Sequence, residues 1–550
     1  MKRWNDDGNI AGLTRRTTDR VAAVAAVAVL VGVPWLLYAR SLALWFTNDD
    51  PMVLAHVLRH KLSTYWSMPA VWQEANRLYF TPLLNTSFQL DLAVFGLDAR
   101  AFHAHQLLAM GVAAALFFLV LRRFVPTVWA FAGGLLLLVG PMAPGCAEYL
   151  VWRHYLEGFI FACLASLATF AALDQDLRRL LPASLLLLGA LAAKETYLPL
   201  ALAFAFVPIG TARRRTASVI VLVAVTIGFL CYRTVMLGGI GSSYRPDADL
   251  AANLGVLAHQ LGPSLFGRID GVLFCLLGLG ALATRPRAAA AWCAVFLLAL
   301  APVVPVAMAI PMASRYLLLP WAVICGVVAW SAAEMRNGRW RFVSMALLVA
   351  LFAAVALRSR SIFRTTYPLV SREGQELRFY FESVRPGDVL LRPAAPSWAF
   401  DGLASVRLAL TGHRPSALPI FDEFPLCEGE PPTRLLSYRD GEIRDITAEI
   451  PRLREAACTK VREVPLTGRL SVDGWRLSWE LGPYLQGTYS ILLRPAIRFD
   501  VPPSGVFQLT WLPVHETLSA RIRYESPEGW VAYSPWRDQA LRDDHAEVRW

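Results

Sequence analysis

The sequence predicts an α-helical, multi-pass membrane protein that ends in a soluble domain. Hydrophobic residues make up 56% of the 550 residues and charged residues only 17%, compared with roughly 25% charged residues in soluble domains. The mean hydropathy is +0.43. Apolar runs long enough to cross a bilayer recur through the first two thirds of the chain. The residues after 358 are polar and rich in proline, and they contain no such run.

Short arginine clusters between the apolar runs predict the orientation of the chain. The net charge is +11, but the arginines lie in loops rather than along one basic surface, so nucleic acid is excluded as a partner. The clusters occupy residues 15–20, 122–123, 178–179, 213–215, 285–287 and 336–341. Cytoplasmic loops of membrane proteins carry an excess of basic residues. The N-terminus and these loops are therefore predicted to be cytoplasmic.

About eleven membrane-spanning helices are predicted from the apolar runs. They cover residues 21–45, 101–121, 127–145, 156–173, 180–193, 196–210, 217–236, 271–284, 289–310, 316–335 and 341–357. The first run is longer than the apolar core of a cleavable signal peptide, so we interpret it as a signal anchor. Residues 1–358 form the predicted membrane domain, and residues 359–550 form the predicted soluble domain.

The segment 180–209 decides on which side of the membrane the later loops lie. It is one apolar run of 30 residues that only Lys194 and Glu195 interrupt. A single helix of this length would measure about 45 Å, whereas the hydrocarbon core is about 30 Å thick. Arginines flank both ends of the run, so it must cross the membrane an even number of times. We therefore divide it into two helices that meet at Lys194 and Glu195.

This topology places the loops 46–100, 141–155, 237–270 and 311–315, and the whole tail, on the outer face. The tail is predicted to begin with helix, strand and helix over 372–412 and to continue from about 462 as a β-sandwich, because apolar and polar residues alternate there. Cys427 and Cys458 could form a disulfide or remain two buried thiols. The eight cysteines show no CxxC spacing, which argues against a zinc or redox site of that type.

Ionisable residues in the outer loops are the candidates for chemistry. Asp49 and Asp50 follow the first helix, and carboxylates at a membrane face are often functional. An alternative is that they begin a helix, because Pro51 follows. Glu148 and Arg153 could form a structural ion pair or line a site, and Lys194 with Glu195 presents the same choice.

Arginine residues of the outer loops suit a phosphate ligand. Arg245 lies in the loop 237–270, and Arg315 with Tyr316 lies at the outer end of the tenth predicted helix. The planar guanidinium group binds phosphate through two hydrogen bonds. The alternative for Arg315 is a side chain that extends to the membrane interface. All these candidates share one face, and this predicts a lipid-linked substrate that carries phosphate and a sugar-like group.

Five motifs in order resemble the GT-C superfamily of membrane glycosyltransferases, in particular its protein O-mannosyltransferase-like branch. They are Asn48-Asp49-Asp50 after the first helix, YFTPLL at 79–84 with VFGLD at 94–98 and Phe102-His103, Pro141 with EYLVWR at 148–153, AKET at 193–196, and SRYL at 314–317. The chain departs from the usual pattern at Thr81, Gly140, Gln106 and Met110, where Arg, His, Asn and His are usual.

The resemblance implies an inverting transfer of a sugar from a polyprenyl-phosphate donor to a hydroxyl of a glycan, lipid or protein acceptor. Asp49 is the implied general base, and Asp50 is the second choice. The implied residues for donor phosphate and substrate binding are Lys194, Arg315, Arg245, Glu148, Arg153, Tyr316, Glu195 and His103. No metal ligands and no cofactor are assigned, although the family leaves a divalent cation open.

The composition and the topology also predict a location and leave alternatives open. Only four of the 53 basic residues are lysines, and this arginine-rich usage indicates a bacterial chain. We expect a multi-pass protein of the bacterial inner membrane with its C-terminal domain in the periplasm. A flippase or transporter of lipid-linked oligosaccharides is one alternative, and an O-antigen polymerase or ligase is another. The ionisable residues gather at one face rather than at the midplane, which favours the transferase over a transporter.

Overall fold

A computed structural model describes most of the chain. The described residues are 7–76, 79–239, 250–309, 314–334, 340–383, 385, 387–413, 418–420, 424–427, 432–473, 476–493, 497–508, 517–541 and 545–550. Arg245, one of the predicted substrate-binding residues, lies outside them.

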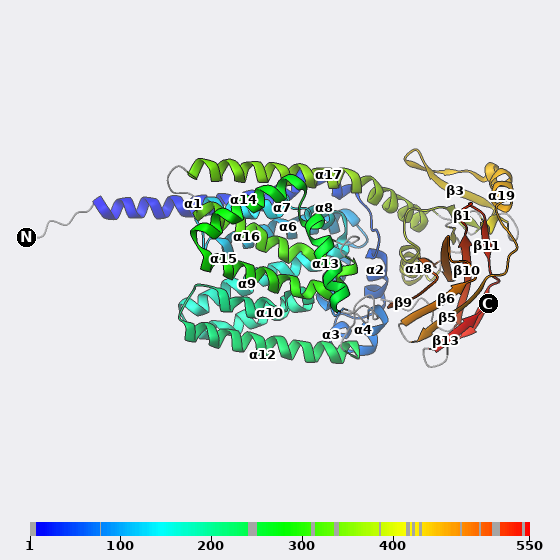
Figure 1. Cartoon of the computed structure of the whole chain (residues 1–550), viewed down its shortest axis with the longest axis horizontal. Helices are drawn as coiled ribbons and strands as arrows, with labels where there is room; N and C mark the ends of the chain where they lie inside the picture. Colours follow the sequence, from blue (N-terminus) through cyan, green and yellow to red (C-terminus); the bar gives the residue numbers. More distant parts are fainter. Residues whose placement is uncertain are drawn as a thin grey trace, which may run out of the picture. The chain divides into compact units, whose positions relative to one another are not determined.

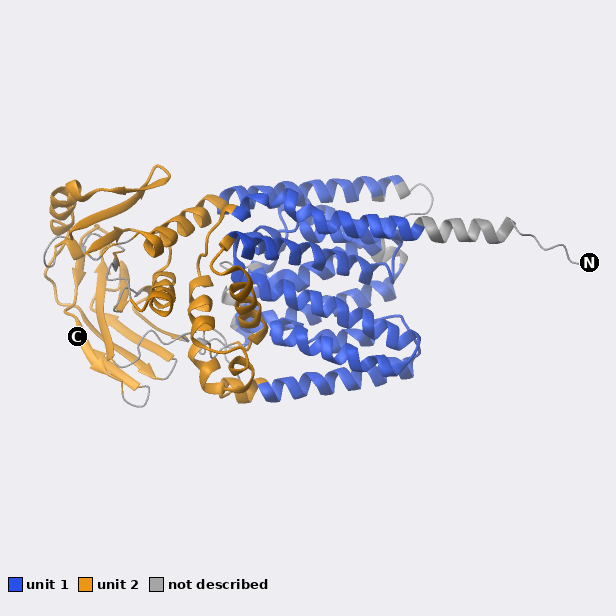
Figure 2. Ribbon diagram, turned by 180° about the vertical axis from the view of Figure 1, so that it is seen from behind, with its two compact units in different colours: residues 1–42, 100–232, 250–366 blue, residues 43–99, 233–249, 367–550 orange. Residues whose placement is uncertain are grey.

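The chain forms two compact units, which Figure 2 shows in blue and orange. Unit 1 comprises residues 1–42, 100–232 and 250–366, and unit 2 comprises residues 43–99, 233–249 and 367–550. The first long loop, 46–100, thus belongs almost entirely to the same unit as the C-terminal tail. Helix α17 (Trp340–Glu382) continues without a break through the predicted boundary at 358/359. The division of function between 1–358 and 359–550 stays a prediction.

Unit 1 is helical throughout its described residues (Figure 1). Besides α17, its helices are α1 (Asp7–Leu37), α6 (Ala99–Leu121), α7 (Thr127–Leu138), α8 (Ala143–Glu148), α9 (Arg153–Asp174), α10 (Leu180–Ala193), α11 (Leu200–Ala203), α12 (Ala212–Leu237), α13 (Leu250–Leu265), α14 (Arg268–Thr284), α15 (Pro286–Leu300) and α16 (Leu318–Glu334). Helix α9 packs along α10, α7 packs against α16, and the glycines of α7 and α6 allow close approach. A Cβ atom on Gly111 of α6 would lie 2.7 Å from the backbone of Val31 in α1.

The structure confirms the multi-pass class. Among the described residues, seven helical spans are long and apolar enough to cross a membrane, and an eighth results if α13 and α14, which meet at 98°, form one broken span. Three predicted crossings are short in the structure, although α10 has the bounds that the sequence predicts, 180–193. Helix α7 has 12 residues, α10 has 14, and the third is the segment Glu195–Phe206. A 14-residue helix measures only about 21 Å, so these three do not reach across a bilayer as straight helices.

The predicted break in the run 180–209 is present. Helix α10 ends at Ala193, Lys194 has an extended backbone (φ −161°, ψ 137°), and a 3₁₀ turn follows over Glu195–Tyr197. An extended residue interrupts the helical hydrogen bonds, so the chain can change direction here. The two polar residues that interrupt the apolar run are therefore the residues at which the helix ends.

The N-terminal segment of unit 2 consists of short helices. They are α2 (Asp50–Arg59), α3 (Thr64–Ser67), α4 (Pro69–Ala75) and α5 (Pro82–Phe95). Helix α2 packs closely on α18 (Ser397–Thr411) of the tail. A Cβ atom on Gly402 of α18 would lie 2.8 Å from the backbone nitrogen of Met52, so only glycine allows this approach.

The tail has the predicted α/β part followed by a β-sandwich. In the first sheet, β1 (Asp388–Leu391) pairs in parallel with β2 (Leu418–Ile420) and β3 (Arg434–Arg439), and β4 (Glu442–Asp445) pairs antiparallel with β3. Helix α19 (Ile450–Cys458) follows, and Cys458 is joined to Cys427 by a disulfide. Of the two alternatives for these cysteines, the structure has the bonded one.

Two antiparallel sheets form the sandwich and share one apolar core. One contains β7 (Thr488–Leu493), β8 (Ile497–Val501), β10 (Thr517–Glu525), β11 (Val531–Tyr533) and β12 (Arg537–Ala540), and the other contains β5 (Thr467–Asp473), β6 (Arg476–Gly482), β9 (Ser504–Gln508) and β13 (His545–Arg549). In β5 and β6 the buried residues alternate with exposed ones, as the sequence predicts. Leu470, Leu477 and Ile522 fill the space between the sheets.

Candidate functional site

Two cations and three aromatic rings meet in unit 1, at the points where helices end. Lys194 follows α10, Arg315 lies in the 3₁₀ turn Ser314–Leu317 before α16, and Tyr155 lies in the first turn of α9. The Nζ atom of Lys194 lies 5.4 Å from the ring centre of Tyr155 and 6.0 Å from that of Tyr316. The guanidinium of Arg315 lies 5.2 Å from the ring centre of Trp152 and 5.3 Å from that of Tyr316.

We call Lys194, Arg315, Trp152, Tyr155 and Tyr316 the cation–aromatic cluster. The two tyrosine rings meet edge to face with centroids 5.9 Å apart, which fixes their planes. Lys194 is only 4% exposed, and its ammonium lies 4.0 Å from the carboxylate of Glu195. Aromatic faces attract cations with about 0.5–2 kcal/mol each. The cluster therefore holds two positive charges on rigid rings in a desolvated place.

Glu148, at the end of α8, is buried in the same unit. The hydroxyl of Thr366 on α17 donates to its carboxylate at 2.7 Å. Burial raises the pKa of Glu148 from 4.5 to about 8, and the Thr366 hydroxyl acts in the opposite direction. Glu148 is therefore largely protonated at neutral pH, and this form can donate a hydrogen bond as well as accept one. Helix α8 lies at the end of the helical bundle away from the N-terminus of α1 (Figure 1).

Arg153 is fully buried between α6 and α9. Its guanidinium donates to the side-chain oxygen of Gln106 at 3.2 Å and to the carbonyl oxygen of Phe102 at 2.9 Å. Gln106 in turn donates to the carbonyl oxygen of Cys146 at 2.6 Å. These contacts link Arg153 to the segment before Glu148, so the structure gives Arg153 a positioning role. His103, on the same helix as Gln106, is also fully buried.

Asp49 and Asp50 belong to unit 2 and differ in environment. Asp50 is 1% exposed, and its carboxylate accepts a hydrogen bond from the backbone N–H of Thr47 at 3.0 Å. It is also the first residue of α2 and precedes Pro51, so it fixes the start of that helix. Asp49 stands at the N-cap position and is half-buried, after Asn48 in a left-handed conformation (φ 51°). The side chain of Asp49 makes no cap hydrogen bond.

The structure thus brings together four of the predicted site residues, namely Lys194, Glu195, Arg315 and Tyr316. Glu148, Arg153 and His103 lie in the same unit, and Asp49 and Asp50 lie in the other. Sequence reasoning did not assign Tyr155, Trp152 or Thr366 to the site. Trp152 lies inside the motif EYLVWR and Tyr155 lies two residues after its end, so their positions three residues apart could have pointed to them. Thr366 is more than 200 residues from Glu148 and left no such signal.

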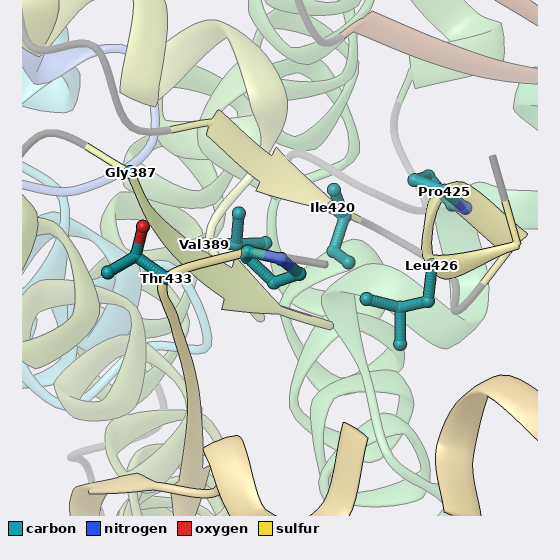
Figure 3. Close-up of a pocket in the computed structure, with 7 residues that line it drawn as sticks. Gly387, Val389, Ile420, Pro425, Leu426 and Thr433 are labelled. Atoms are coloured by element: carbon teal, nitrogen blue, oxygen red, sulfur yellow. The ribbon is translucent and has the colours of Figure 1, made fainter. Parts of the chain in front are cut away.

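A shallow apolar pocket in unit 2 contains none of the predicted site residues. It has a volume of about 300 Å³ and lies beside β1 and β2, as Figure 3 shows. Val389, Ile420 and Leu426 line one part of it, and Gly387 and Thr433 lie at the other end (Figure 3). Gly387 and Thr433 precede β1 and β3, whereas ligands of parallel sheets usually bind beyond the carboxyl ends of the strands. We assign no chemistry to this pocket.

One group of described residues has the geometry of a metal site. It consists of His56, His60 and Glu74, all in unit 2. The sequence prediction assigned no metal ligands.

Comparisons with known proteins found similar solved structures, among them one of ArnT and one of AftD. No family model and no curated relative matches the chain. The crystal structure of ArnT from Cupriavidus metallidurans bound to undecaprenyl phosphate is 14% identical, has a TM-score of 0.41, and covers 78% of this chain and 95% of its own. The cryo-EM structure of the arabinofuranosyltransferase AftD from Mycobacteria is 13% identical, has a TM-score of 0.43, and covers 91% of this chain. The chain spans 40% of the length of AftD.

Proposed function

We propose that this protein is a membrane glycosyltransferase that moves a sugar from a polyprenyl-phosphate donor to an acceptor hydroxyl. The observation that carries the proposal is the cation–aromatic cluster at the helix ends of unit 1. A lysine and an arginine share the ring of Tyr316, and each also faces a second ring. The five sequence motifs that resemble GT-C enzymes include all of these residues except Tyr155.

The cluster suits a phosphate group better than a neutral ligand. Desolvating a cation costs several kcal/mol unless an anion compensates for it. Lys194 is buried and lies 4.0 Å from the carboxylate of Glu195, and a bound phosphate would add further negative charge beside it. Arg315 offers a planar fork that can bind two phosphate oxygens at once, and Lys194 offers a compact charge. The aromatic faces suit the apolar side of a sugar ring or the first isoprene units of the donor.

The proposed reaction is a single displacement. Asp49 takes the proton of the acceptor hydroxyl, whose oxygen attacks the anomeric carbon. The bond between that carbon and the phosphate oxygen breaks, and the phosphate leaves with the electron pair. The departing polyprenyl phosphate needs no proton, because Lys194 and Arg315 offset its new charge. Asp49 is a better base candidate than Asp50, because the carboxylate of Asp50 is buried and already accepts the N–H of Thr47.

We further propose that the tail of unit 2 lies on the outer face of a bacterial inner membrane. The arginine clusters support this orientation through the excess of basic residues expected in cytoplasmic loops. The disulfide between Cys427 and Cys458 gives independent support, because disulfides persist in the periplasm and are rare in the cytoplasm. Protease digestion of the tail in spheroplasts tests this orientation. Protection of the tail would contradict it.

The donor site is tested with the purified full chain and with undecaprenyl phosphate as the probe. We expect Lys194→Met and Arg315→Met each to weaken binding and to lower transfer from radiolabelled polyprenyl-phosphate hexoses and pentoses by about 100-fold or more. Lys460→Met and Arg537→Met are matched controls, because both residues are exposed in the tail. Full binding and transfer in both cluster variants would overturn the proposed donor site.

One observation favours a second candidate, a transporter of lipid-linked oligosaccharides. Helices α13 and α14 meet at 98°, and broken helices are typical of transporter binding sites. At the bend, the guanidinium of Arg358 lies 3.2 Å from the buried carboxylate of Asp270. A transporter would move labelled lipid across proteoliposomes without cleaving its sugar–phosphate bond. Release of polyprenyl phosphate only in the presence of an acceptor would instead identify the transferase.

A further inference from the structure

His56 in the last turn of α2 and His60, the residue after the helix, place their rings side by side. His56 and His60 are four residues apart, which is close to one helical turn. Their ring centres lie 4.7 Å apart. Two histidines whose rings lie this close can bind one metal ion. His60 is the C-cap residue of α2, where the helix stops.

Glu74 reaches the same place from α4. Its Oε2 atom lies 2.8 Å from Nε2 of His60. One ligand atom from each of His56, His60 and Glu74 can be chosen so that all three lie within 4.8 Å of one another. The three groups come from two helices separated by a turn and by α3, so the chain folds back to bring them together.

His56 supplies the observation that points to a ligand. It is 3% exposed, and neither ring nitrogen has a hydrogen-bond partner. Buried polar side-chain atoms usually have a partner. Tyr65 packs at 5.4 Å from the His56 ring, and its hydroxyl donates to the carbonyl oxygen of His60 at 3.0 Å. The amide of Gln89 also donates to this carbonyl, at 3.2 Å. The backbone of His60 is thus held in place while the ring nitrogens of His56 lack partners.

We propose that His56, His60 and Glu74 bind a divalent transition-metal ion, with zinc as the best match. Two imidazoles and one carboxylate form a known zinc ligand set, in which water takes the fourth position. Zinc lies about 2.0–2.2 Å from such ligand atoms. Two ligand atoms of a tetrahedral site are then roughly 3.3 Å apart, so rotations of the three side chains suffice to close the site.

An ion pair is the competing explanation for Glu74. The guanidinium of Arg59 lies 2.7 Å from Oε1 of Glu74, and both side chains are partly exposed. Such surface pairs contribute about 0–1 kcal/mol to stability. Arg59 contacts Oε1, whereas His60 faces Oε2. Arg59 can therefore hold the carboxylate in orientation while Oε2 binds the metal, and the ion pair leaves the nitrogens of His56 unexplained.

A metal here would fasten α2 to α4 within the N-terminal segment of unit 2. Helix α2 also begins with Asp50 and is preceded by Asp49. The bound ion would therefore stiffen the helix whose first turn carries both aspartates. This role is structural, and it does not depend on the proposed transfer reaction.

The test is metal content of the purified full chain, prepared with an affinity tag that contains no histidine. After zinc loading and dialysis, we expect equimolar zinc in the wild type and in the Arg59→Ala variant. We expect His56→Ala, His60→Ala and Glu74→Gln each to lose the zinc. His545→Ala is the matched control, because His545 is exposed in the tail.

Two further measurements keep the proposal testable if a variant folds poorly. In the wild type, zinc should raise the melting temperature of the chelator-treated protein, because a ligand that binds only the folded state stabilises it. Cobalt should give visible absorption bands that disappear when zinc is added. The proposal is overturned if the wild type binds no zinc, or if zinc content is unchanged in all three ligand variants. It is also overturned if two results are found together. The first is an equal loss of stability in Arg59→Ala and Glu74→Gln, and the second is that zinc raises the melting temperature of neither variant.

Discussion

Basic side chains are held in different ways in the cation–aromatic cluster of unit 1 and in the α/β part of unit 2. In unit 1, Lys194 and Arg315 lie over the rings of Tyr155, Trp152 and Tyr316. In the α/β part of unit 2, Arg434 donates to both oxygens of Asp388, with Nε to Oδ1 at 3.0 Å. Arg439 likewise donates to both oxygens of Glu449. The first arrangement places the positive charges against aromatic rings, and we propose that it binds phosphate, whereas the second pairs each guanidinium with one carboxylate.

This difference between ring-bound and carboxylate-paired cations indicates which charged residues should be tested for function. An arginine with a matched carboxylate on a soluble surface contributes modestly to stability and has little capacity left for a ligand. Burying a lysine costs free energy, because its charge loses contact with water, so Lys194 is a position at which we expect a substitution to affect function. The comparison therefore predicts that changes in unit 1 reduce activity, whereas changes in the tail of unit 2 reduce stability only.

Asp49 is the expected exception, because it lies in unit 2 and yet is the proposed general base. We expect Asp49→Asn to lower transfer by about 100-fold to 10,000-fold, the range typical of a lost general base. Donor binding should persist, since undecaprenyl phosphate needs no base. The measurement is transfer from radiolabelled polyprenyl-phosphate sugar by the purified full chain.

The variant Asp50→Asn distinguishes the role of a general base from the structural role of the residue that begins α2. This change weakens the acceptor for the Thr47 N–H, so we expect a lower melting temperature and a smaller loss of transfer than in Asp49→Asn. Asp538→Asn, at an exposed position of β12, is the control. Full transfer activity of Asp49→Asn would show that Asp49 is not the general base. The residues needed for transfer would then be sought in unit 1 alone.

The next largest effect is expected from the disulfide of the tail. The bond closes a loop between Cys427 and Cys458, which are 31 residues apart. The double variant Cys427→Ser/Cys458→Ser should lose about 2–4 kcal/mol of stability in the α/β part, because the unfolded loop gains freedom. Hydrogen exchange of β1 and β3 measures this loss. Transfer activity at low temperature should stay unchanged, and a parallel loss of activity would contradict the separation of roles.

The sequence predicted the fold class and one decisive break, because both depend on local composition. Arginine positions and run length required a turn at Lys194, and the helix does end there. The length of α7 was less predictable than that of α10, whose predicted bounds of 180–193 are the observed ones. Hydropathy extends α7 to residue 145, whereas the helix ends at Leu138 just before Gly140 and Pro141. A Cβ atom on Gly140 would clash with the indole of Trp321, a contact that only the fold reveals.

The sequence indicated candidate site residues where a short motif contains charged side chains. It did not indicate contacts between residues that lie far apart in the chain. Lys194, Arg315 and Tyr316 came from short motifs, and the structure places them together, while their role in substrate binding stays a prediction. The partner of Glu148 was missed, because Thr366 is 218 residues away in the chain. The group of His56, His60 and Glu74 was missed for a similar reason. Its two histidines have a recognisable spacing, but Glu74 becomes their neighbour only when α4 folds back.

Glu148 provides a pH test within unit 1. Burial raises its pKa from 4.5 to about 8 in the folded protein. Between these values the unfolded chain has lost the proton and the folded chain keeps it, so stability should fall as pH rises from about 5 to about 8 and then level off. Glu148→Gln mimics the protonated form and still accepts from Thr366. Its melting temperature should therefore exceed that of the wild type increasingly toward pH 8. Parallel curves for the two proteins would show that Glu148 is ionised.

The smallest effect is expected from the ion pair between Asp388 and Arg434. Burial acts to raise the pKa of Asp388, but the hydrogen bonds and charges of Arg434 and Arg385 together outweigh it and hold the pKa below its usual range. The stabilisation is therefore present above the unfolded value of about 3.9 and is lost as the pH falls through the lower folded value. Asp388→Asn should cost about 1 kcal/mol or less at pH 7, because Arg434 remains partly exposed to water.

Arg434→Met is the informative counterpart of Asp388→Asn. It leaves a 3% exposed carboxylate with the backbone N–H of Arg385 as a remaining donor, at 3.0 Å. Replacing the exposed partner of such a pair, Arg434, costs more stability than replacing the buried partner, Asp388. The reason is that the buried carboxylate then keeps its charge but loses its partner. Hydrogen exchange of β1 and β3 in the full chain should therefore rank Arg434→Met below Asp388→Asn in stability. Transfer activity should be equal in both variants. A large loss of activity in either would mean that paired charges of unit 2 also serve the reaction, and the contrast between the two units would fail.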